Sequence, residues 1–155
     1  MGIGNTPELA YAKAQLAAGQ KLPLSGTVFV SVKDEDKDAV FDAVSILYKL
    51  GFKIIATGGT ATFLSEKNIP TDRINKVREG RPHIVDMIKN NEIDLVINTT
   101  SDKKAIAESF SIRRSTLMFN IPYTTTMAGA RATALAIKAM TEDRLDVKTI
   151  QEYNE

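Results

Sequence analysis

The sequence predicts an α/β domain whose parallel sheet is covered by helices on both faces. Short β-rich apolar runs alternate with stretches of helical period, beginning with "TVFVSV" (27–32) and "FKIIAT" (52–57). Uninterrupted apolar runs of this length fit strands that are buried on both sides. Strand–helix–strand units are right-handed and place their strands in parallel, so the alternation indicates a parallel sheet. The length of 155 residues suits one compact domain.

Helix start and stop signals separate the strands along the chain. Acidic residues crowd 34–38, then Val40, Val44 and Leu47 share one helical face, and Gly51 follows the last turn. Pro122 favours an edge position for the strand around it. The remaining helices are predicted at 60–68, 81–91, 101–119 and 127–140, and the remaining strands at 72–75, 93–99, 121–125 and 146–150.

Composition narrows the classes of partner. The chain has 20 basic and 19 acidic residues, so its net charge is close to zero. This balance predicts no nucleic-acid or membrane-surface partner. It has no cysteine, which excludes disulfides, thiolate metal sites and cysteine nucleophiles. No apolar run approaches the ~20 residues of a membrane span, and no signal-peptide pattern opens the chain. We therefore expect a cytoplasmic protein.

The first 26 residues predict a helix and a linker ahead of the main domain. Thr6 and Pro7 form a helix start, with Thr as the cap and Pro at the first helical position. Leu9, Ala12 and Leu16 share one helix face, and "AAGQKLPLSG" (17–26) has the composition of a linker. The predicted division is thus 1–26 and 27–155.

Polar and cationic groups follow each of the first four strands. Because the carboxyl ends of parallel strands meet at one sheet edge, these groups are expected to converge there. Hydroxyls, glycines at helix starts and fixed positive charges are the groups that bind phosphate. In chain order they are Ser31, Lys33 and Lys37; Thr57, Gly58, Gly59 and Thr60; Asn75, Lys76, Arg78 and Arg81; and Asn98, Thr99, Thr100 and Ser101.

Each segment alone has an ordinary structural interpretation. Thr57-Gly58-Gly59-Thr60 is neither a dinucleotide fingerprint nor a P-loop, and it could be a turn with glycines at positive φ and a threonine cap. Residues 98–101 could be a helix cap, and "KVREGRPH" (76–83) a solvated basic loop. Convergence of all the segments at one edge favours an anion site.

The sequence predicts no catalytic residue and no metal site. His83 is the only histidine and follows Pro82 at a helix start, which favours capping or packing. The acids near the strand ends are Asp34, Glu35, Glu79 and Asp102. No pattern places any of them buried beside the expected phosphate, so the site is better equipped to bind than to react.

Several segments resemble a known family. "VFVSVKDEDK", "GFKIIATGGTATFL", "INKVREGRPHIVDMIKNNEIDLVINTTS" and "ESFSIRRSTLMFNIPYTTTMAGA" are similar to the C-terminal allosteric domain of the carbamoyl-phosphate synthase large subunit. The combination of "EGRPHI", "INTTS" and "IRR" is specific, and the resemblance covers nearly the whole chain. Residues 8–19 resemble the helix that ends the preceding ATP-binding half. The resemblance thus assigns 1–26 to that half and 27–155 to the allosteric domain.

The resemblance implies a methylglyoxal-synthase-like fold, a three-layer αβα sandwich with a five-stranded parallel sheet. It implies a regulatory domain of glutamine-dependent carbamoyl-phosphate synthase, an enzyme of pyrimidine and arginine biosynthesis. In bacterial relatives UMP inhibits and IMP activates through one phosphate site. The matching positions are Lys37, Thr57, Thr60, Lys76, Asn98, Thr99 and Thr100, to which the groups at the strand ends add Gly58 and Gly59.

The resemblance also sets expectations about partners. ATP, Mg²⁺ and K⁺ belong to the catalytic domains of the large subunit, and no cofactor is expected in this chain. Those domains and the glutaminase small subunit are the implied protein partners, and self-association stays open. Animal relatives sense UTP and phosphoribosyl pyrophosphate, or N-acetylglutamate, so the fold does not fix the ligand. Bacterial relatives sense ornithine, but Thr124 stands where an acid is expected, leaving Thr125 as the candidate contact.

Two alternative functions stay open at this point. Methylglyoxal synthase, a lyase acting on dihydroxyacetone phosphate, shares the implied fold, and its chemistry needs a carboxylate base. Here Glu79 would have to supply that base. A purely structural oligomerisation domain would bind no ligand at all.

Overall fold

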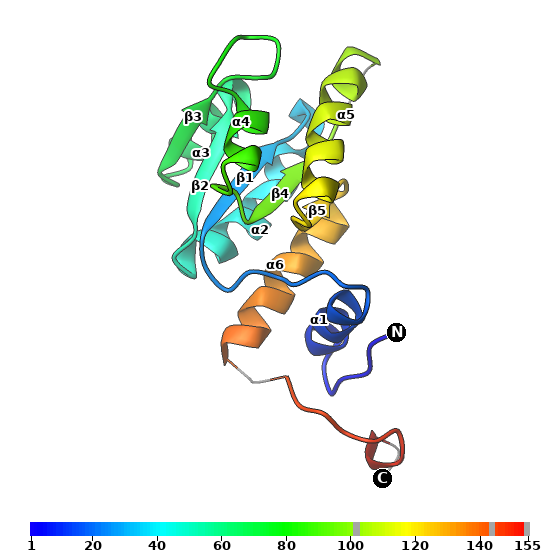
Figure 1. Cartoon of the computed structure of the whole chain (residues 1–155). Coiled ribbons are helices and arrows are strands. Elements are labelled where there is room, and N and C mark those ends of the chain that lie inside the picture. The colour runs from blue at the N-terminus through cyan, green and yellow to red at the C-terminus, as the bar shows by residue number, and fades with distance from the viewer. Residues whose placement is uncertain (101–102, 143–144, 154–155) are drawn as a thin grey trace.

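The computed structural model describes residues 1–100, 103–142 and 145–153, which build one sheet with helices on both faces (Figure 1). The strands are β1 (Thr27–Ser31), β2 (Lys53–Thr57), β3 (Thr71–Ile74), β4 (Leu95–Asn98) and β5 (Tyr123–Thr124). The helices are α1 (Pro7–Ala17), α2 (Lys37–Lys49), α3 (Gly58–Glu66), α4 (Ile84–Lys89), α5 (Lys103–Met118) and α6 (Met127–Glu142), with short 3₁₀ turns η1 (Asp34–Asp36) and η2 (Gln151–Tyr153).

The sheet has five strands in the order β3-β2-β1-β4-β5, and every pair is parallel. This confirms the fold class predicted from the sequence. The chain moves outward from β1 to β3 and then returns to place β4 on the other side of β1. The strand order therefore reverses between β1 and β4, the point where open α/β sheets bind their ligands.

Both faces of β1 are buried, which explains its unbroken apolar sequence. Val28 and Val30 join a cluster with residues of α2, α3 and α6, whereas Phe29 joins a second cluster with residues of α4 and α5. Neighbouring residues of a strand point to opposite faces, so one short run supplies both cores. The result is the three-layer arrangement that the resemblance implies.

Helix α1 packs on the domain through α6 (Figure 1). The Oγ1 of Thr6 accepts a 3.3 Å hydrogen bond from the N–H of Leu9, which confirms the predicted cap. Ala12 is buried in the core, and the Tyr11 hydroxyl lies 3.1 Å from Oγ1 of Thr133 on α6. The origin of residues 1–26 in a preceding domain stays a prediction.

Two predicted elements need correction. The strand expected at 146–150 is wrong: the segment has no strand pairing, and Val147 is fully exposed. It follows α6 away from both sheet edges, so its apolar residues have no neighbouring strand (Figure 1). The helix expected at 60–68 begins earlier, at Gly58.

In the described ranges, no helix combines the length and the apolar character that crossing a bilayer requires.

Candidate anion-binding site

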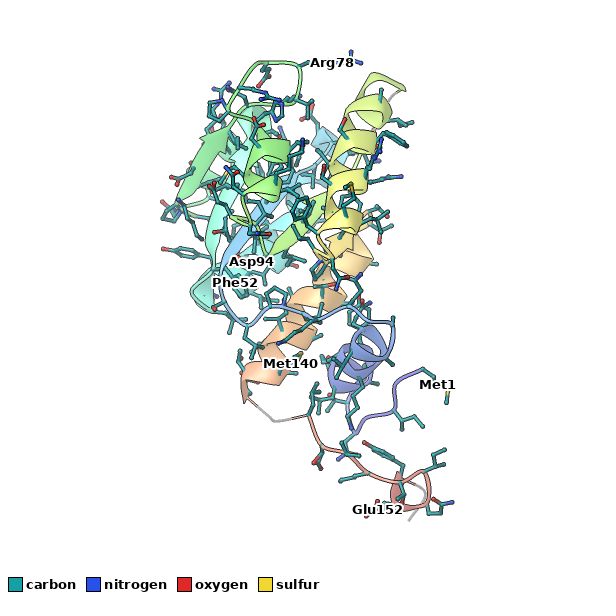
Figure 2. The ribbon with its side chains drawn as sticks, viewed as in Figure 1. Met1, Phe52, Arg78, Asp94, Met140 and Glu152 are labelled. Carbon is teal, nitrogen blue, oxygen red and sulfur yellow. The ribbon has the colours of Figure 1, made fainter. Side chains whose placement is uncertain are left out.

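A cleft of about 170 Å³ opens at the carboxyl ends of β1, β2 and β4. It therefore lies at the reversal of strand order, as the fold predicts. The loop after β3 reaches the same end of the sheet, and Figure 2 shows Arg78 at its tip, far from Phe52 and Asp94, which precede β2 and β4. The lining comprises Phe29, Ser31, Val32, Lys33, Thr57, Lys76, Val77, Ile84, Asn98, Thr99, Thr100, Ser109 and Ile112.

Helix α3 begins directly after β2 and points its amino end toward this edge. Thr57 occupies the N-cap position, but its side chain makes no capping hydrogen bond. Its Oγ1 instead lies 2.9 Å from Oγ of Ser31 on the neighbouring strand. The first N–H groups of a helix have no acceptor within the helix and carry its partial positive charge. The start of α3 therefore offers backbone donors to an anion.

The turn interpretation of the double glycine is wrong. Gly58 and Gly59 are the first two residues of α3, and the described glycines with positive φ are elsewhere, at positions 19, 26, 51 and 80. Their small size leaves the first turn open. A Cβ on Gly58 would lie 3.1 Å from Nη2 of Arg73, whereas one on Gly59 would lie 3.4 Å from Nζ of Lys37.

Two predicted threonine hydroxyls are engaged inside the protein. Oγ1 of Thr60, a residue only 2% exposed, accepts a hydrogen bond from the N–H of Val32 at 3.3 Å. Oγ1 of Thr99 accepts from the N–H of Lys33 at 3.1 Å. These bonds fix the segment after β1 against α3 and against the residue that follows β4. Thr60 lies outside the lining of the cleft, so only its backbone N–H is left to face an anion at the start of α3, whereas Thr99 and Thr100 line the cleft.

Asn98 is held by a hydrogen-bond network. Its Nδ2 donates to Oγ of Ser109 at 2.8 Å and to the hydroxyl of Tyr123 at 3.0 Å. The Tyr123 hydroxyl also accepts from Nε of Arg113 at 3.3 Å. Both amide hydrogens are thereby used, and Oδ1 remains as an acceptor. Asn98 is thus suited to an N–H or O–H of a ligand more than to a phosphate oxygen.

Sequence reasoning did not identify Ser109 and Tyr123 as parts of the site. Ser109 is 3% exposed and holds Asn98 from α5, and Tyr123 does so from β5. The available signal was a serine that interrupts the apolar period of the helix predicted at 101–119. The pattern alone did not show which side chain the serine would meet.

Two lysines flank the site. Nζ of Lys37 forms an ion pair with Oδ1 of Asp34 at 2.7 Å and lies beside Gly59, just outside the lining of the cleft. Lys76 lines the cleft, and no described acid pairs with its ammonium group. The hydrogen bond and the charge of Lys37 hold the pKa of Asp34 below its ordinary value, and the charge of Lys76 lowers it further. Both lysines therefore act on the carboxylate of Asp34, so both ammonium groups lie on the side of the site where Asp34 is located.

This arrangement predicts the titration of Asp34. By NMR, we expect the pKa of its carboxyl to lie below 3.8 and to rise toward that value in Lys37→Ala, because the hydrogen bond is lost. A depressed folded-state pKa stabilises the fold above pH 3.8, and that stabilisation is lost as the pH falls through the folded-state pKa. An Asp34 pKa that is the same in both proteins would contradict the ion pair.

The remaining candidate acids do not enter the described part of the cleft. Oε2 of Glu35 pairs with Nζ of Lys33 at 2.9 Å. Glu79 is exposed, and its Oε2 accepts a 2.9 Å hydrogen bond from the backbone N–H of Lys76. Asp102 and Ser101 lie outside the described residues. No carboxylate is present among the described residues that line the cleft.

His83 has the packing role that its position favours, and its side chain makes no capping hydrogen bond. It is buried at the N-cap of α4, and its backbone N–H donates to Oδ2 of Asp86 at 3.1 Å. Its Nδ1 lies 3.2 Å from the same oxygen. His83 is not among the residues that line the cleft.

Thr125 belongs to a different cleft, of about 340 Å³, between α1, α5, β5 and α6. Tyr123 and Thr124 also line it. Within the described structure, Oγ1 of Thr124 and Oε1 of Gln20 are buried there without a hydrogen-bond partner. Binding of a second effector at Thr125 stays a prediction.

The fold defines the class as a methylglyoxal-synthase-like domain. Residues 39–125 match the model of the MGS-like domain family, and the chain belongs to this family. A crystal structure of methylglyoxal synthase from Elizabethkingia anophelis NUHP1 matches with a TM-score of 0.56, covering 86% of this chain and 93% of that one. At 19% sequence identity this likeness shows the fold alone.

Relatives of higher identity are carbamoyl phosphate synthase large chains. That of Rhizobium meliloti (strain 1021) is 56% identical over 155 residues, which is 100% of this chain. That of Mesorhizobium japonicum is 52% identical over 153 residues, or 99% of this chain. The chain spans 13% of the length of each of these relatives. The resemblance predicted from the sequence is thereby confirmed.

Proposed function

We propose that this chain is the regulatory, nucleotide-binding domain of a glutamine-dependent carbamoyl phosphate synthase, an enzyme of pyrimidine and arginine biosynthesis. The observation that carries the proposal is the start of α3, where backbone N–H groups that have no acceptor within the helix lie beside Lys37 and the cleft that Lys76 lines. Since the described lining holds no carboxylate, the site is equipped to bind a phosphate rather than to abstract a proton.

A nucleoside monophosphate suits the two parts of this site. Its phosphate would accept hydrogen bonds from the N–H groups of Gly58, Gly59 and Thr60 and would pair with Lys76. Its base or ribose would lie in the cleft over Phe29, Ile84 and Ile112, with Oδ1 of Asn98 as acceptor. UMP as inhibitor and IMP as activator are the proposed ligands, and sharing one phosphate site makes them competitors.

Regulation would follow from a difference in affinity between two states of the whole synthase. A ligand shifts such an equilibrium by no more than the difference between its binding free energies for the two states. Coupling free energies between two sites are typically ~1–3 kcal/mol. The proposed partners are the catalytic domains of the same large chain, which would hold ATP, Mg²⁺ and K⁺, and the glutaminase small subunit. We propose a cytoplasmic location for this assembly.

Calorimetric titration of the 155-residue chain with UMP and with IMP tests the proposal. We expect saturable binding of each nucleotide and displacement of one by the other. At a free concentration 100 times Kd, binding should stabilise the fold by about 2.7 kcal/mol in thermal unfolding. The proposal fails if millimolar UMP and IMP give neither heat nor a thermal shift.

The second candidate function is a methylglyoxal synthase-type lyase, favoured by the likeness to the solved methylglyoxal synthase. Its chemistry needs a carboxylate at the substrate carbons. Glu79 is the candidate, but it is exposed and bound to the backbone of Lys76. Incubation with dihydroxyacetone phosphate is expected to give no methylglyoxal. Methylglyoxal formation by the unchanged chain, together with no formation by the Glu79→Gln variant, would favour the lyase.

A further inference from the structure

Arg73 lies across the first turn of α3. In β3 the side chain of Ile74 is buried in the cluster on the α4 face, so its neighbour Arg73 points to the opposite face, which α3 covers. Nη2 and Cζ of its guanidinium lie 3.1 and 3.3 Å from the position that a Cβ on Gly58 would take. The guanidinium thus occupies the space left open by the missing side chain of Gly58.

A cation is electrostatically unfavourable at this place. The amino end of a helix carries partial positive charge, which repels a guanidinium. None of the described acids forms an ion pair or hydrogen bond with Arg73; Asp72, next to it on β3, pairs with Lys53 at 2.8 Å. Lys37 and Lys76 add further positive charge near the same helix start, and Asp34 is the carboxylate paired with Lys37.

The cations approach the helix start from different sides. Successive residues of an α-helix are rotated by about 100° around its axis. Arg73 lies beside Gly58 and Lys37 beside Gly59, so the two cations flank the turn in different directions. An anion in front of this turn would therefore be surrounded by positive charge, and a guanidinium offers it two parallel N–H donors.

We propose that Arg73 is a phosphate-binding residue of this site, contacting the anionic group of the effector from the β3 side. This inference rests on the proposed nucleotide-binding function and adds a residue to it. It also assigns a role to Gly58, which leaves the guanidinium room beside the turn. The ligand class is a phosphate monoester, whose free oxygens can accept the two guanidinium donors.

The test compares Arg73→Gln with the unchanged chain by UMP and IMP titration and by urea unfolding without ligand. We expect affinity for both nucleotides to fall about 10-fold or more, since a charge-assisted contact is lost. Unfolding without ligand should need the same urea concentration or a higher one, because repulsion from the helix start is relieved. Arg73→Lys should retain part of the affinity, because it keeps the charge without the paired donors.

Lys53→Gln is the matched control, since it removes the same charge at the opposite end of β2, and it should leave affinity within about 2-fold. Unchanged affinity in Arg73→Gln, alongside weakened binding in Lys76→Ala, would overturn the assignment of Arg73 and leave the proposed function standing. Lower stability without ligand, with unchanged affinity, would mark Arg73 as structural and also overturn it. An unchanged chain that binds neither nucleotide would overturn both proposals.

Discussion

Replacing Lys76 with alanine is expected to weaken UMP and IMP binding by about 10- to 100-fold, the loss typical of a hydrogen bond to a charged group. The ammonium group lines the cleft, and no described acid shares it. Because the side chain is exposed, its removal should change the free energy of unfolding by less than about 0.5 kcal/mol. Calorimetry and urea unfolding measure the two effects separately.

Lys89→Gln is the control for this prediction. Lys89 is exposed in the last turn of α4, whose amino end, at His83, is the end nearer the cleft. Its replacement removes one positive charge and should leave nucleotide affinity within about 2-fold. Equal affinities of the Lys76→Ala and unchanged chains would remove Lys76 from the phosphate site. Equal losses in both variants would indicate a response to net charge rather than to a local contact.

The second large effect concerns the core. Phe29 is fully buried in the central strand, opposite Ile55 and Val96 on the neighbouring strands. Phe29→Ala should lower the free energy of unfolding by about 3–5 kcal/mol, through lost burial and the cavity left behind. Domains of this kind have a total stability of about 5–15 kcal/mol, so the variant should unfold at a much lower urea concentration.

Phe110→Ala is the control for Phe29→Ala, because it removes the same side-chain atoms from the surface instead of from the core. Phe110 lies on α5 and is 67% exposed. Its replacement should change the free energy of unfolding by less than about 0.5 kcal/mol in the same urea experiment. A comparable loss of stability in both variants would contradict the placement of β1 at the centre of the sheet.

Much of the fold could be predicted from the sequence because local chemistry determines it. The run at 27–32 reads as a strand buried on both faces, and β1 indeed supplies Val28 to one core and Phe29 to the other. Gly51 has a φ of 91° just after Leu50, the C-cap of α2, a conformation that glycine adopts without strain. The position of β5 at the edge of the sheet likewise agrees with the prediction from Pro122, which directly precedes this strand.

The errors occurred where the outcome depends on tertiary neighbours. The segment 146–150 has strand-like composition, but a strand needs a partner edge, and the chain is carried away from the sheet by α6. The double glycine was compatible with a turn, since glycine adopts positive φ without strain. Gly58 instead begins α3, where Arg73 lies close to the position of its missing Cβ atom and Lys37 lies beside that of Gly59.

The site could be predicted in outline but not in detail. The groups at the strand ends identified Thr57, Lys76 and Asn98, and all three line the cleft. The hydroxyl of Thr60 is used by Val32, a bond that no spacing rule shows. Arg73 was not predicted either, because nothing in β3 reveals which helix start lies beside it.

The proposed function requires the start of α3 to bind the phosphate of an effector. The most direct measurement is the change of amide NMR shifts when UMP or IMP is added to the 155-residue chain. We predict the largest changes at the N–H groups of Gly58, Gly59 and Thr60, and the same residues should respond to both nucleotides. Saturable changes confined to the cleft around Thr125, or no changes at millimolar nucleotide, would contradict the claim.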